Sequence, residues 1–314
     1  MKIHVPYVSN QSIGGGYTFY DNLVKAFNKS IVEWVSEEDS PDILFAFSPT
    51  TINGETIDRC KKNGAKFVLR LDGVPEDSRN SGRGTRRLVE YALKADHIIY
   101  QSYFIEQTLG RILRQNGVKC PTLIVRNGVD TDTYNTDGTK VNFQGEPKIL
   151  NIAFRKDPNK RYEEVLGMYR EYWTYNKQAN LILLGRYPTE WMTYNMGFFN
   201  GERYQRLGVI DDPVQKATFI RSCDVMFFPS YADPAPNVVL EAMACGVPVI
   251  YNRYGGAAEY IEKAGVAIGS GTYEEIIKQA LAIPKEEVRA QAMEHSLARM
   301  SSDYLKAFQV SMML

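Results

Sequence analysis

Short apolar segments alternate along this chain with longer segments in which apolar residues recur at the period of a helix. Apolar runs of this length, separated by helices, are typical of strands buried on both faces of a parallel sheet. Strand-like runs occupy residues 1–8, 43–47, 66–71, 97–100 and 122–125, and helical segments lie between them at 20–27, 55–62, 85–94 and 103–114. The first part of the chain is therefore predicted to have an α/β fold.

The alternation stops after the first series and then begins again. Residues 127–147 are polar, contain three glycines and a proline and show no sustained period, which is typical of a linker. A second series follows, with strand-like runs at 148–154, 181–184, 224–228, 247–251 and 266–268, and helical segments near 160–175, 213–221 and 236–244, from 255, and at the end. We therefore predict two α/β domains, residues 1–140 and 141–298, with a ligand site in a cleft between them at the carboxyl ends of strands.

Length and charge exclude several other classes of protein. A chain of 314 residues fits about two domains. Lys+Arg and Asp+Glu are both 37, so the chain is no polycation and we expect no nucleic-acid partner. The start lacks the apolar stretch of a signal peptide, and no apolar run is long enough to span a membrane. The four cysteines are far apart and are expected to be reduced thiols in a cytoplasmic protein.

The most informative segment is residues 228–259, FPSYADPAPNVVLEAMACGVPVIYNRYGGAAE. Pro236 fits the first turn of a helix because that position needs no N–H, and the amides of Asn237–Leu240 would then face the strand ends as an anion site. Asp233 lies before this helix and Glu241 about one turn inside it. Amides suit a phosphate and carboxylates suit hydroxyls, so the pattern favours a ligand that has both. The same spacing equally fits a turn-forming Asp233 and a Glu241 on a helix surface.

This segment resembles the signature of family 4 glycosyltransferases, which have the GT-B fold. In that family a proline–serine pair precedes an acidic residue, and a glutamate follows in the pattern L-E-A-M-A-x-G-x-P-V-[IV]. Here the pair is Pro229-Ser230, the acidic residue is Asp233, and residues 240–250 read LEAMACGVPVI. Asp233 stands where the family usually has the longer glutamate. Residues 255–259, GGAAE, also resemble the family's turn that faces the donor.

Three further segments are similar to family landmarks. Residues 155–160, RKDPNK, resemble an Arg…Pro-x-Lys pattern whose cations lie on the donor diphosphate; without the resemblance they fit a solvated basic turn. Residues 13–17, IGGGY, match the glycine-rich first loop, and otherwise fit a flexible turn. Asp72 closes the strand 66–71 where much of the family has a histidine at the reaction centre, so it either receives the acceptor proton or shapes the turn before Gly73.

The resemblance implies two Rossmann-like domains facing across a cleft, with the C-terminal helix of residues 299–314 crossing back to the first domain. It also implies a retaining glycosyltransferase that moves a sugar from a nucleotide-diphosphate sugar to a hydroxyl of a glycan or glycoconjugate. Arg155 and Lys160 would neutralise the departing diphosphate, Asp233 would hold the donor sugar, and Glu241 would hold the ribose. The implied catalytic residues are Asp233, Arg155, Lys160 and Asp72, and the implied binding residues are Gly15, Gly16, Arg155, Lys160, Asn237, Val238, Val239 and Glu241.

Other functions stay open on the residues alone. Another GT-B reaction, such as epimerisation or hydrolysis of a nucleotide sugar, fits the same donor site, and so does a catalytically weak sugar-nucleotide-binding module. No cofactor or metal is expected: no cluster has metal-ligand spacing, and Asp130 and Asp132 form an Asp-x-Asp that fits loop acids. A basic cluster fits either a solvated loop or a site for an anionic acceptor or membrane surface; its members are Arg79, Arg83, Arg86 and Arg87.

Overall fold

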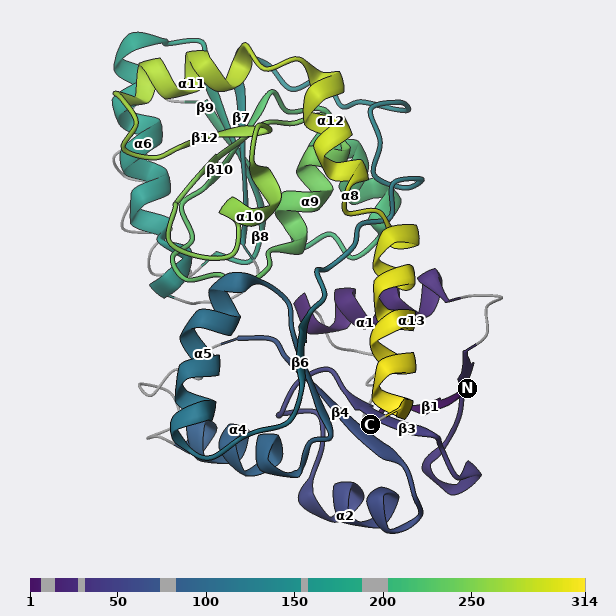
Figure 1. The fold of residues 1–314 in the computed structure, drawn as a ribbon. Helices are drawn as coiled ribbons and strands as arrows, with labels where there is room; N and C mark the ends of the chain where they lie inside the picture. The colour runs from purple at the N-terminus through teal and green to yellow at the C-terminus, as the bar shows by residue number, and fades with distance from the viewer. Residues whose placement is uncertain (7–14, 28–31, 74–82, 154–157, 188–202, 314) are drawn as a thin grey trace. The chain divides into compact units, whose positions relative to one another are not determined.

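The protein is described by a computed structural model that covers residues 1–6, 15–27, 32–73, 83–153, 158–187 and 203–313 (Figure 1). The contacts divide it into two compact units, one of Met1–Gly128 with Leu297–Leu314 and the other of Val129–Ser296. The predicted boundary at residue 140 is wrong, because residues 129–140 pack within the second unit.

The first unit contains a six-stranded sheet in the order β2-β1-β3-β4-β5-β6, and all its neighbouring strands are parallel. Its strands are β1 (Lys2–His4), β2 (Glu33–Trp34), β3 (Ile43–Ala46), β4 (Lys66–Leu71), β5 (His97–Tyr100) and β6 (Thr122–Ile124). Its helices are α1 (Gly15–Ala26), α2 (Gly54–Lys62), α4 (Arg83–Lys94), α5 (Tyr103–Gln115) and α13 (Leu297–Met313), with a short 3-10 turn at Glu37–Asp39.

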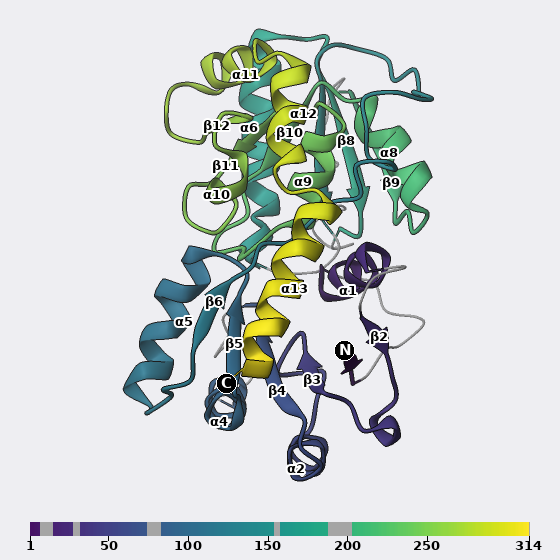
Figure 2. The same cartoon turned by 45° about the vertical axis from the view of Figure 1, so that its right-hand side comes forward.

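Alternate residues of each strand fill the two faces of this sheet. Leu44 faces the core formed with α2, α4 and α5, and the next residue, Phe45, faces the core formed with α1 and α13. The C-terminal helix contributes Tyr304 and Phe308 to that second core. Figures 1 and 2 both show α13 beside α1, so the prediction that the C-terminal helix packs on the first domain is confirmed.

The second unit contains another parallel six-stranded sheet, in the order β12-β11-β10-β7-β8-β9. Its strands are β7 (Lys148–Ala153), β8 (Asn180–Gly185), β9 (Arg203–Gly208), β10 (Val225–Phe228), β11 (Val249–Tyr251) and β12 (Gly265–Ala267). Its helices are α6 (Tyr162–Tyr175), α8 (Pro213–Arg221), α9 (Asn237–Ala244), α10 (Ala258–Ile261), α11 (Tyr273–Leu281) and α12 (Lys285–Met293), with a 3-10 turn at Pro158–Lys160. The predicted pair of parallel α/β domains is thus confirmed.

The strand order of the second sheet reverses between β7 and β10. From β7 the chain adds β8 and β9 on one side, and it then returns to add β10, β11 and β12 on the other. In open parallel sheets, ligands bind at the carboxyl ends of the strands at such a switch point. A ligand site of this unit is therefore expected in the loops that follow β7, β10 and β11.

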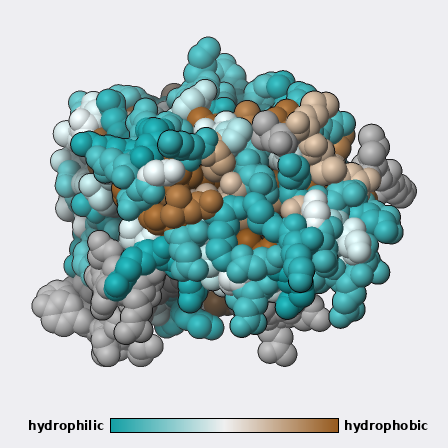
Figure 3. Space-filling model, turned by 60° about the horizontal axis from the view of Figure 1, so that its bottom comes forward, coloured by the Kyte–Doolittle hydropathy of each residue, from teal (hydrophilic) through white to brown (hydrophobic). Residues whose placement is uncertain are grey.

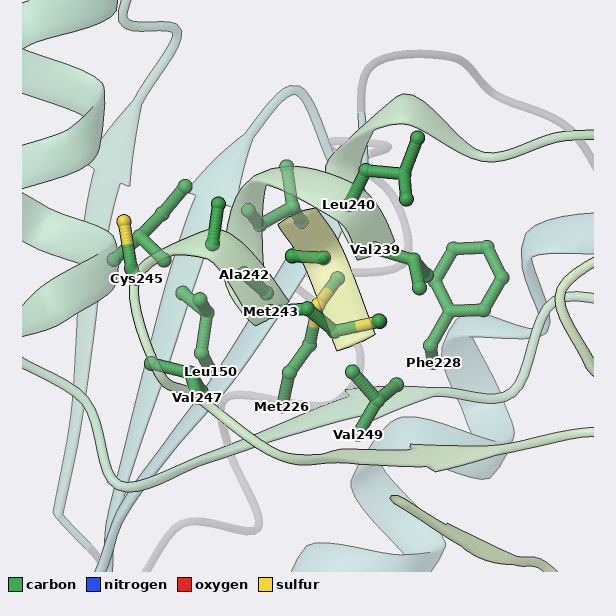
Figure 4. Packing of buried hydrophobic residues seen from close by; sticks show 14 of the residues in the cluster. Leu150, Met226, Phe228, Val239, Leu240, Ala242, Met243, Cys245, Val247 and Val249 are labelled. Carbon is green, nitrogen blue, oxygen red and sulfur yellow. The ribbon is translucent and has the colours of Figure 1, made fainter. Parts of the chain in front are cut away.

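Helix α9 is anchored firmly beneath those loops. Its side chains Val239 and Met243 pack on Met226 and Val249 of the sheet, as Figure 4 shows. All of its residues except Val238 are buried. A helix held this tightly presents its first turn at a fixed position.

Candidate functional site

Two charged side chains predicted for the site meet at the switch point. Lys160 ends the 3-10 turn after β7, and Asp233 lies in the loop after β10. The Lys160 Nζ atom donates to Asp233 Oδ2 at 2.7 Å, and both side chains are mostly covered. The structure therefore joins the expected diphosphate cation directly to the expected sugar-binding carboxylate.

The backbone around this ion pair adopts strained conformations. Arg161, directly after Lys160, has a φ of 53°, and Ala232, directly before Asp233, has a φ of 56°. The left-handed region costs a residue with a Cβ roughly 1–2 kcal/mol. Such strain persists where the surrounding structure fixes it, and it concentrates at functional sites. The two strained residues therefore support the assignment of Lys160 and Asp233 to a site.

The loop after β11 packs against the loop that carries Asp233. The Gly256 amide donates to the Asp233 carbonyl oxygen at 2.8 Å. Gly255 has a φ of 144°, and a Cβ atom placed there would lie 2.9 Å from that same oxygen. Only glycine fits this close approach, which explains the first of the two glycines in the turn predicted to face the donor.

An aromatic stack lies on the rim of these loops. The rings of Tyr231 and Tyr254 stack with centroids 4.4 Å apart and planes 19° apart, although the two residues are 40% and 48% exposed. The Arg161 guanidinium lies 5.5 Å from the Tyr231 ring centroid. The Tyr231 amide also donates to the Asn159 carbonyl oxygen at 2.7 Å. The stack thus ties together the loops after β7, β10 and β11.

The start of α9 lies at the same edge of the sheet. Its N-cap residue is Pro236, whose side chain cannot accept a hydrogen bond from the amides of the first turn. A helix start of this kind, with its partial positive charge, suits an anion. Of the predicted binding residues here, Asn237 and Val239 are buried and Val238 is half-buried, so Val238 and Val239 would contribute through their amides.

Glu241 lies in an unexpected environment. The residue is only 2% exposed, so the alternative that placed it on a helix surface is wrong. Its Oε2 atom lies 2.6 Å from Nζ of Lys216, which comes from α8. Burial, followed by the charge of the Glu241 carboxylate, raises the pKa of the adjacent Tyr134 phenol well above its usual range.

The remaining predicted residues belong to other segments. Arg155 and Arg79 lie outside the described residues. Gly15 and Gly16 begin α1, after the first strand of the first unit. Asp72 is half-buried at the end of β4.

The basic cluster is described only in part. Arg83 begins α4, and Arg86 and Arg87 of that helix are exposed.

Figure 3 shows one face of the molecule, which is mainly hydrophilic with small apolar patches. None of the helices in the described part of the chain is both long and apolar enough to cross a membrane.

Metal ligands do not gather in the described part of the chain, where no group of three or more His, Cys, Asp or Glu side chains is placed to hold an ion. The Asp130 carboxylate of the Asp-x-Asp sequence accepts from the amides of Asp132 and Thr133 at 3.2 and 3.4 Å. These bonds are those of a local turn, as expected for loop acids.

Four neighbouring residues were not predicted from the sequence: Lys216, Tyr134, Tyr231 and Tyr254. The helical period gave one usable signal, because Lys216 lies one turn before the apolar Ile220 on the same face of α8. No comparable pattern marks the tyrosines, which lie in loops.

Comparison with known proteins identifies the family to which this chain belongs. The model of the family described as glycosyl transferases group 1 matches residues 135–297, more than half of the chain. A probable sucrose-phosphate synthase of Thermosipho melanesiensis is 26% identical over 202 residues, which cover 60% of this chain and 47% of that protein. An N,N'-diacetylbacillosaminyl-diphospho-undecaprenol alpha-1,3-N-acetylgalactosaminyltransferase of Campylobacter jejuni is 29% identical over 180 residues, 52% of this chain and 45% of that protein. The chain thus spans about half the length of these relatives.

Among solved structures, the fold is similar to that of Anabaena Alr3699/HepE in complex with UDP. The two superpose with a TM-score of 0.73 at 17% identity, and the match covers 99% of this chain and 100% of the other. At this identity the likeness concerns the fold, and it matches both six-stranded sheets described above.

Proposed function

Because the chain belongs to the glycosyl transferases of group 1, we propose that it transfers a sugar from a nucleotide-diphosphate sugar to a hydroxyl group of an acceptor. The observation that carries the proposal is the convergence of Lys160, Asp233 and the uncapped start of α9 at the switch point of the second sheet. A cation and helix amides suit a diphosphate, and a carboxylate suits sugar hydroxyls.

The proposed donor site assigns a separate task to each group. The first-turn amides of α9 and the ammonium of Lys160 bind the diphosphate, whose negative charge grows as the glycosidic bond breaks. A cation at that position stabilises the transition state more than the bound donor. Asp233 accepts hydrogen bonds from the donor sugar and supports positive charge at the anomeric carbon. Arg155 is proposed as a second cation on the diphosphate.

The proposed reaction retains the configuration of the sugar. The bond between the anomeric carbon and the diphosphate oxygen breaks, and the acceptor oxygen forms its bond to that carbon on the same face. The proton of the acceptor hydroxyl passes to the diphosphate oxygen. Asp72, together with Gly15 and Gly16 of the first unit, is proposed for the acceptor and diphosphate side of the reaction. The acceptor is proposed to be a glycan or glycoconjugate, since the Campylobacter relative is named for a diphospho-undecaprenol substrate.

The first test is calorimetric titration with UDP, UDP-glucose, GDP-mannose and ADP-glucose, because HepE was solved with UDP. We expect one nucleotide sugar to bind and to be turned over, at least slowly, with release of nucleoside diphosphate. Lys160→Met should reduce that turnover by about 100-fold, the usual loss for one transition-state donor. Lys306→Met is the matched control, because Lys306 is an exposed lysine that is also paired with an aspartate.

The products distinguish the proposed reaction from its alternatives. Transfer to added glycans supports a glycosyltransferase, whereas an epimerised nucleotide sugar would identify an epimerase. Binding of a nucleotide sugar without any turnover would overturn the enzymatic proposal. Turnover should persist in excess EDTA, because protein cations are proposed to neutralise the diphosphate; loss of turnover that Mn²⁺ restores would contradict this part.

A further inference from the structure

Helix α8 buries two cationic side chains against the interior of the second unit. Lys216 is 8% exposed and Arg221 is 7% exposed, and both lie on the helix face that also buries Ala217 and Ile220. Lysine is almost never buried to this extent unless it is paired with a charge. Each of these two side chains therefore requires a partner in the interior.

The two cations have different partners. Arg221 donates to the carbonyl oxygens of Asn135 and Thr133 at 3.1 and 3.2 Å. It therefore binds the first segment of the second unit, which begins at Val129. Lys216 pairs instead with the Glu241 carboxylate at 2.6 Å, and its Nζ lies 6.0 Å from the Tyr134 ring centroid. The buried acidic side chains in the described part of the chain are Asp130 and Glu241, and Glu241 belongs to α9.

This pair lies towards the functional edge of the sheet. Helix α8 leads into β10 and α9 leads into β11, so both helices begin at the carboxyl ends of the strands. Lys216 is the fourth residue of α8, and Glu241 is the fifth residue of α9. Both side chains thus lie about one turn from the edge where the α9 amides and the Lys160–Asp233 pair are found.

We propose that Lys216 is a positioning residue for nucleotide recognition, which holds the Glu241 carboxylate in place to accept hydrogen bonds from the ribose hydroxyls of the donor. The proposal rests on the proposed function, since it requires a nucleotide ligand. A carboxylate has two oxygens and about four acceptor positions, so the contact with Lys216 leaves positions for hydroxyl groups. The Lys216 ammonium at 2.6 Å also fixes the position of one carboxylate oxygen.

The alternative is an ion pair that only joins α8 to α9. Both roles predict a loss of stability when Lys216 is removed, because a buried carboxylate without its partner is strongly destabilising. Only the positioning role predicts a change in ribose recognition. The readout must therefore be the ratio of two affinities in one variant rather than stability or a single affinity.

The test measures the dissociation constants of UDP and 2′-deoxy-UDP by calorimetry. The wild type should prefer UDP by about tenfold or more, because a site built for a hydroxyl leaves polar groups unpaired without it. Lys216→Met should reduce this preference to less than about twofold to threefold, and Lys216→Arg, which keeps the charge, should restore most of it. The matched control is Lys148→Met, which removes a half-buried lysine that is paired with Asp224 at the start of β7 and should keep the wild-type preference.

A double-mutant cycle tests whether Lys216 acts through Glu241. In the Glu241→Gln background, Lys216→Met should not change the ratio further, because the group that Lys216 positions has lost its charge. This double variant buries no unpaired charge, so it should fold even where the single variant is unstable. Lys216→Gln replaces Lys216→Met if the latter does not fold, with the same expected ratio.

Three outcomes would overturn the inference. A folded Lys216→Met or Lys216→Gln protein that keeps the wild-type ratio would show that the ion pair is structural only. An equal effect of Lys216→Met with and without the Glu241 charge would show that Lys216 acts independently of Glu241. A wild type that binds every nucleotide without regard to the 2′-hydroxyl would also overturn it, whereas a wild type that binds no nucleotide would first overturn the proposed function.

Discussion

At the scale of single residues, His97 shows how burial sets the behaviour of an ionisable group. Its side chain is fully buried in the first unit, and its Nδ1 lies 2.7 Å from Oγ of Ser311 in α13. Burial lowers the pKa of this imidazole below its ordinary value, although a hydrogen bond with the backbone of Ala307 opposes the shift. The histidine is therefore neutral in the folded protein at neutral pH.

This environment predicts that acid weakens the first unit. The unfolded chain binds a proton at His97 near pH 6.5, whereas the folded unit binds it only at a lower pH. The neutral form of His97 is favoured in the folded unit, and this contribution to stability is fully present above pH 6.5. It is lost as the pH falls towards the pKa of the folded state, and it amounts to about 1.4 kcal/mol for each unit by which folding lowers the pKa. Hydrogen-exchange protection factors of β5 and α13 should therefore be lower at pH 5 than at pH 7.

Two variants check the assignment of this effect. His97→Gln has no group to titrate at this position, so the difference in protection between pH 7 and pH 5 should shrink. Ser311→Ala removes the hydrogen-bond partner but keeps the imidazole, so its pH dependence should persist. An unchanged pH dependence in His97→Gln would assign the effect to other groups.

The sequence identified three charged residues of the site but not the partner of Glu241. Lys160, Asp233 and Glu241 lie in motifs with fixed spacing, and the first two are joined in the structure. The partner of Glu241, Lys216, is distant in sequence and comes from a neighbouring helix. The helical period places Lys216 on the buried face of α8, but the pairing with Glu241 depends on how α8 and α9 pack together.

At the scale of elements, the buried strands could be predicted from the sequence and two exposed edge strands could not. The central strands β3 and β10 are continuous apolar runs, and β7 is apolar except for Lys148 and Asn151; all three lie where they were predicted. β9, with the sequence RYQRLG, and the two-residue β2 were not predicted. Both are edge strands, and β9 is partly exposed, so neither carries the apolar signal of a buried strand.

The loop after β11 provides a prediction at this scale. Gly255→Ala would place a Cβ atom 2.9 Å from the Asp233 carbonyl oxygen and 3.1 Å from the Asp233 amide nitrogen. Because both atoms belong to the backbone, the loop that carries Asp233 must move. We expect the affinity for the donor nucleotide sugar to fall by about tenfold, which corresponds to about 1.4 kcal/mol, while the fold is kept.

A matched glycine separates this displacement from simple backbone strain. Gly269 has a φ of 85°, and a Cβ atom added there meets nothing within 4 Å. Gly269→Ala should therefore cost about 1 kcal/mol of stability without affecting donor affinity. Calorimetry and thermal unfolding of both variants give the comparison, and equal donor affinity in the two variants would refute a role for Gly255 in placing Asp233.

At the scale of the whole molecule, the first unit is assembled from both ends of the chain. Leu297–Leu314 follow the second unit in sequence but belong to the first. The helical period of this segment predicted a helix, but the period does not say which sheet the helix covers. That expectation came from the family resemblance, and the packing of Tyr304 and Phe308 in the core of the first unit confirms it.

This discontinuity predicts that removal of the last helix will unfold one unit selectively. Deletion of residues 297–314 takes Met300, Tyr304 and Phe308 out of the core of the first unit and exposes Phe19 and Phe45. Three large side chains contribute roughly 5–9 kcal/mol at about 1.5–3 kcal/mol each. That loss is comparable to the whole stability of a typical domain, about 5–15 kcal/mol, so the first unit should unfold.

The second unit should survive this deletion, because its cores contain no residue of α13. The pairing of Val129 with the segment before the deletion is also kept, since the Val129 amide donates to the His295 carbonyl oxygen at 2.8 Å. Hydrogen exchange followed by mass spectrometry should show loss of protection in β1–β6 and retained protection in β7–β12. As a control, Val310→Ala with Met312→Ala changes side chains that are 40% and 43% exposed, and should leave both units protected. Equal loss of protection in the two sheets would mean that the units fold as one cooperative body, because independently stable units open separately.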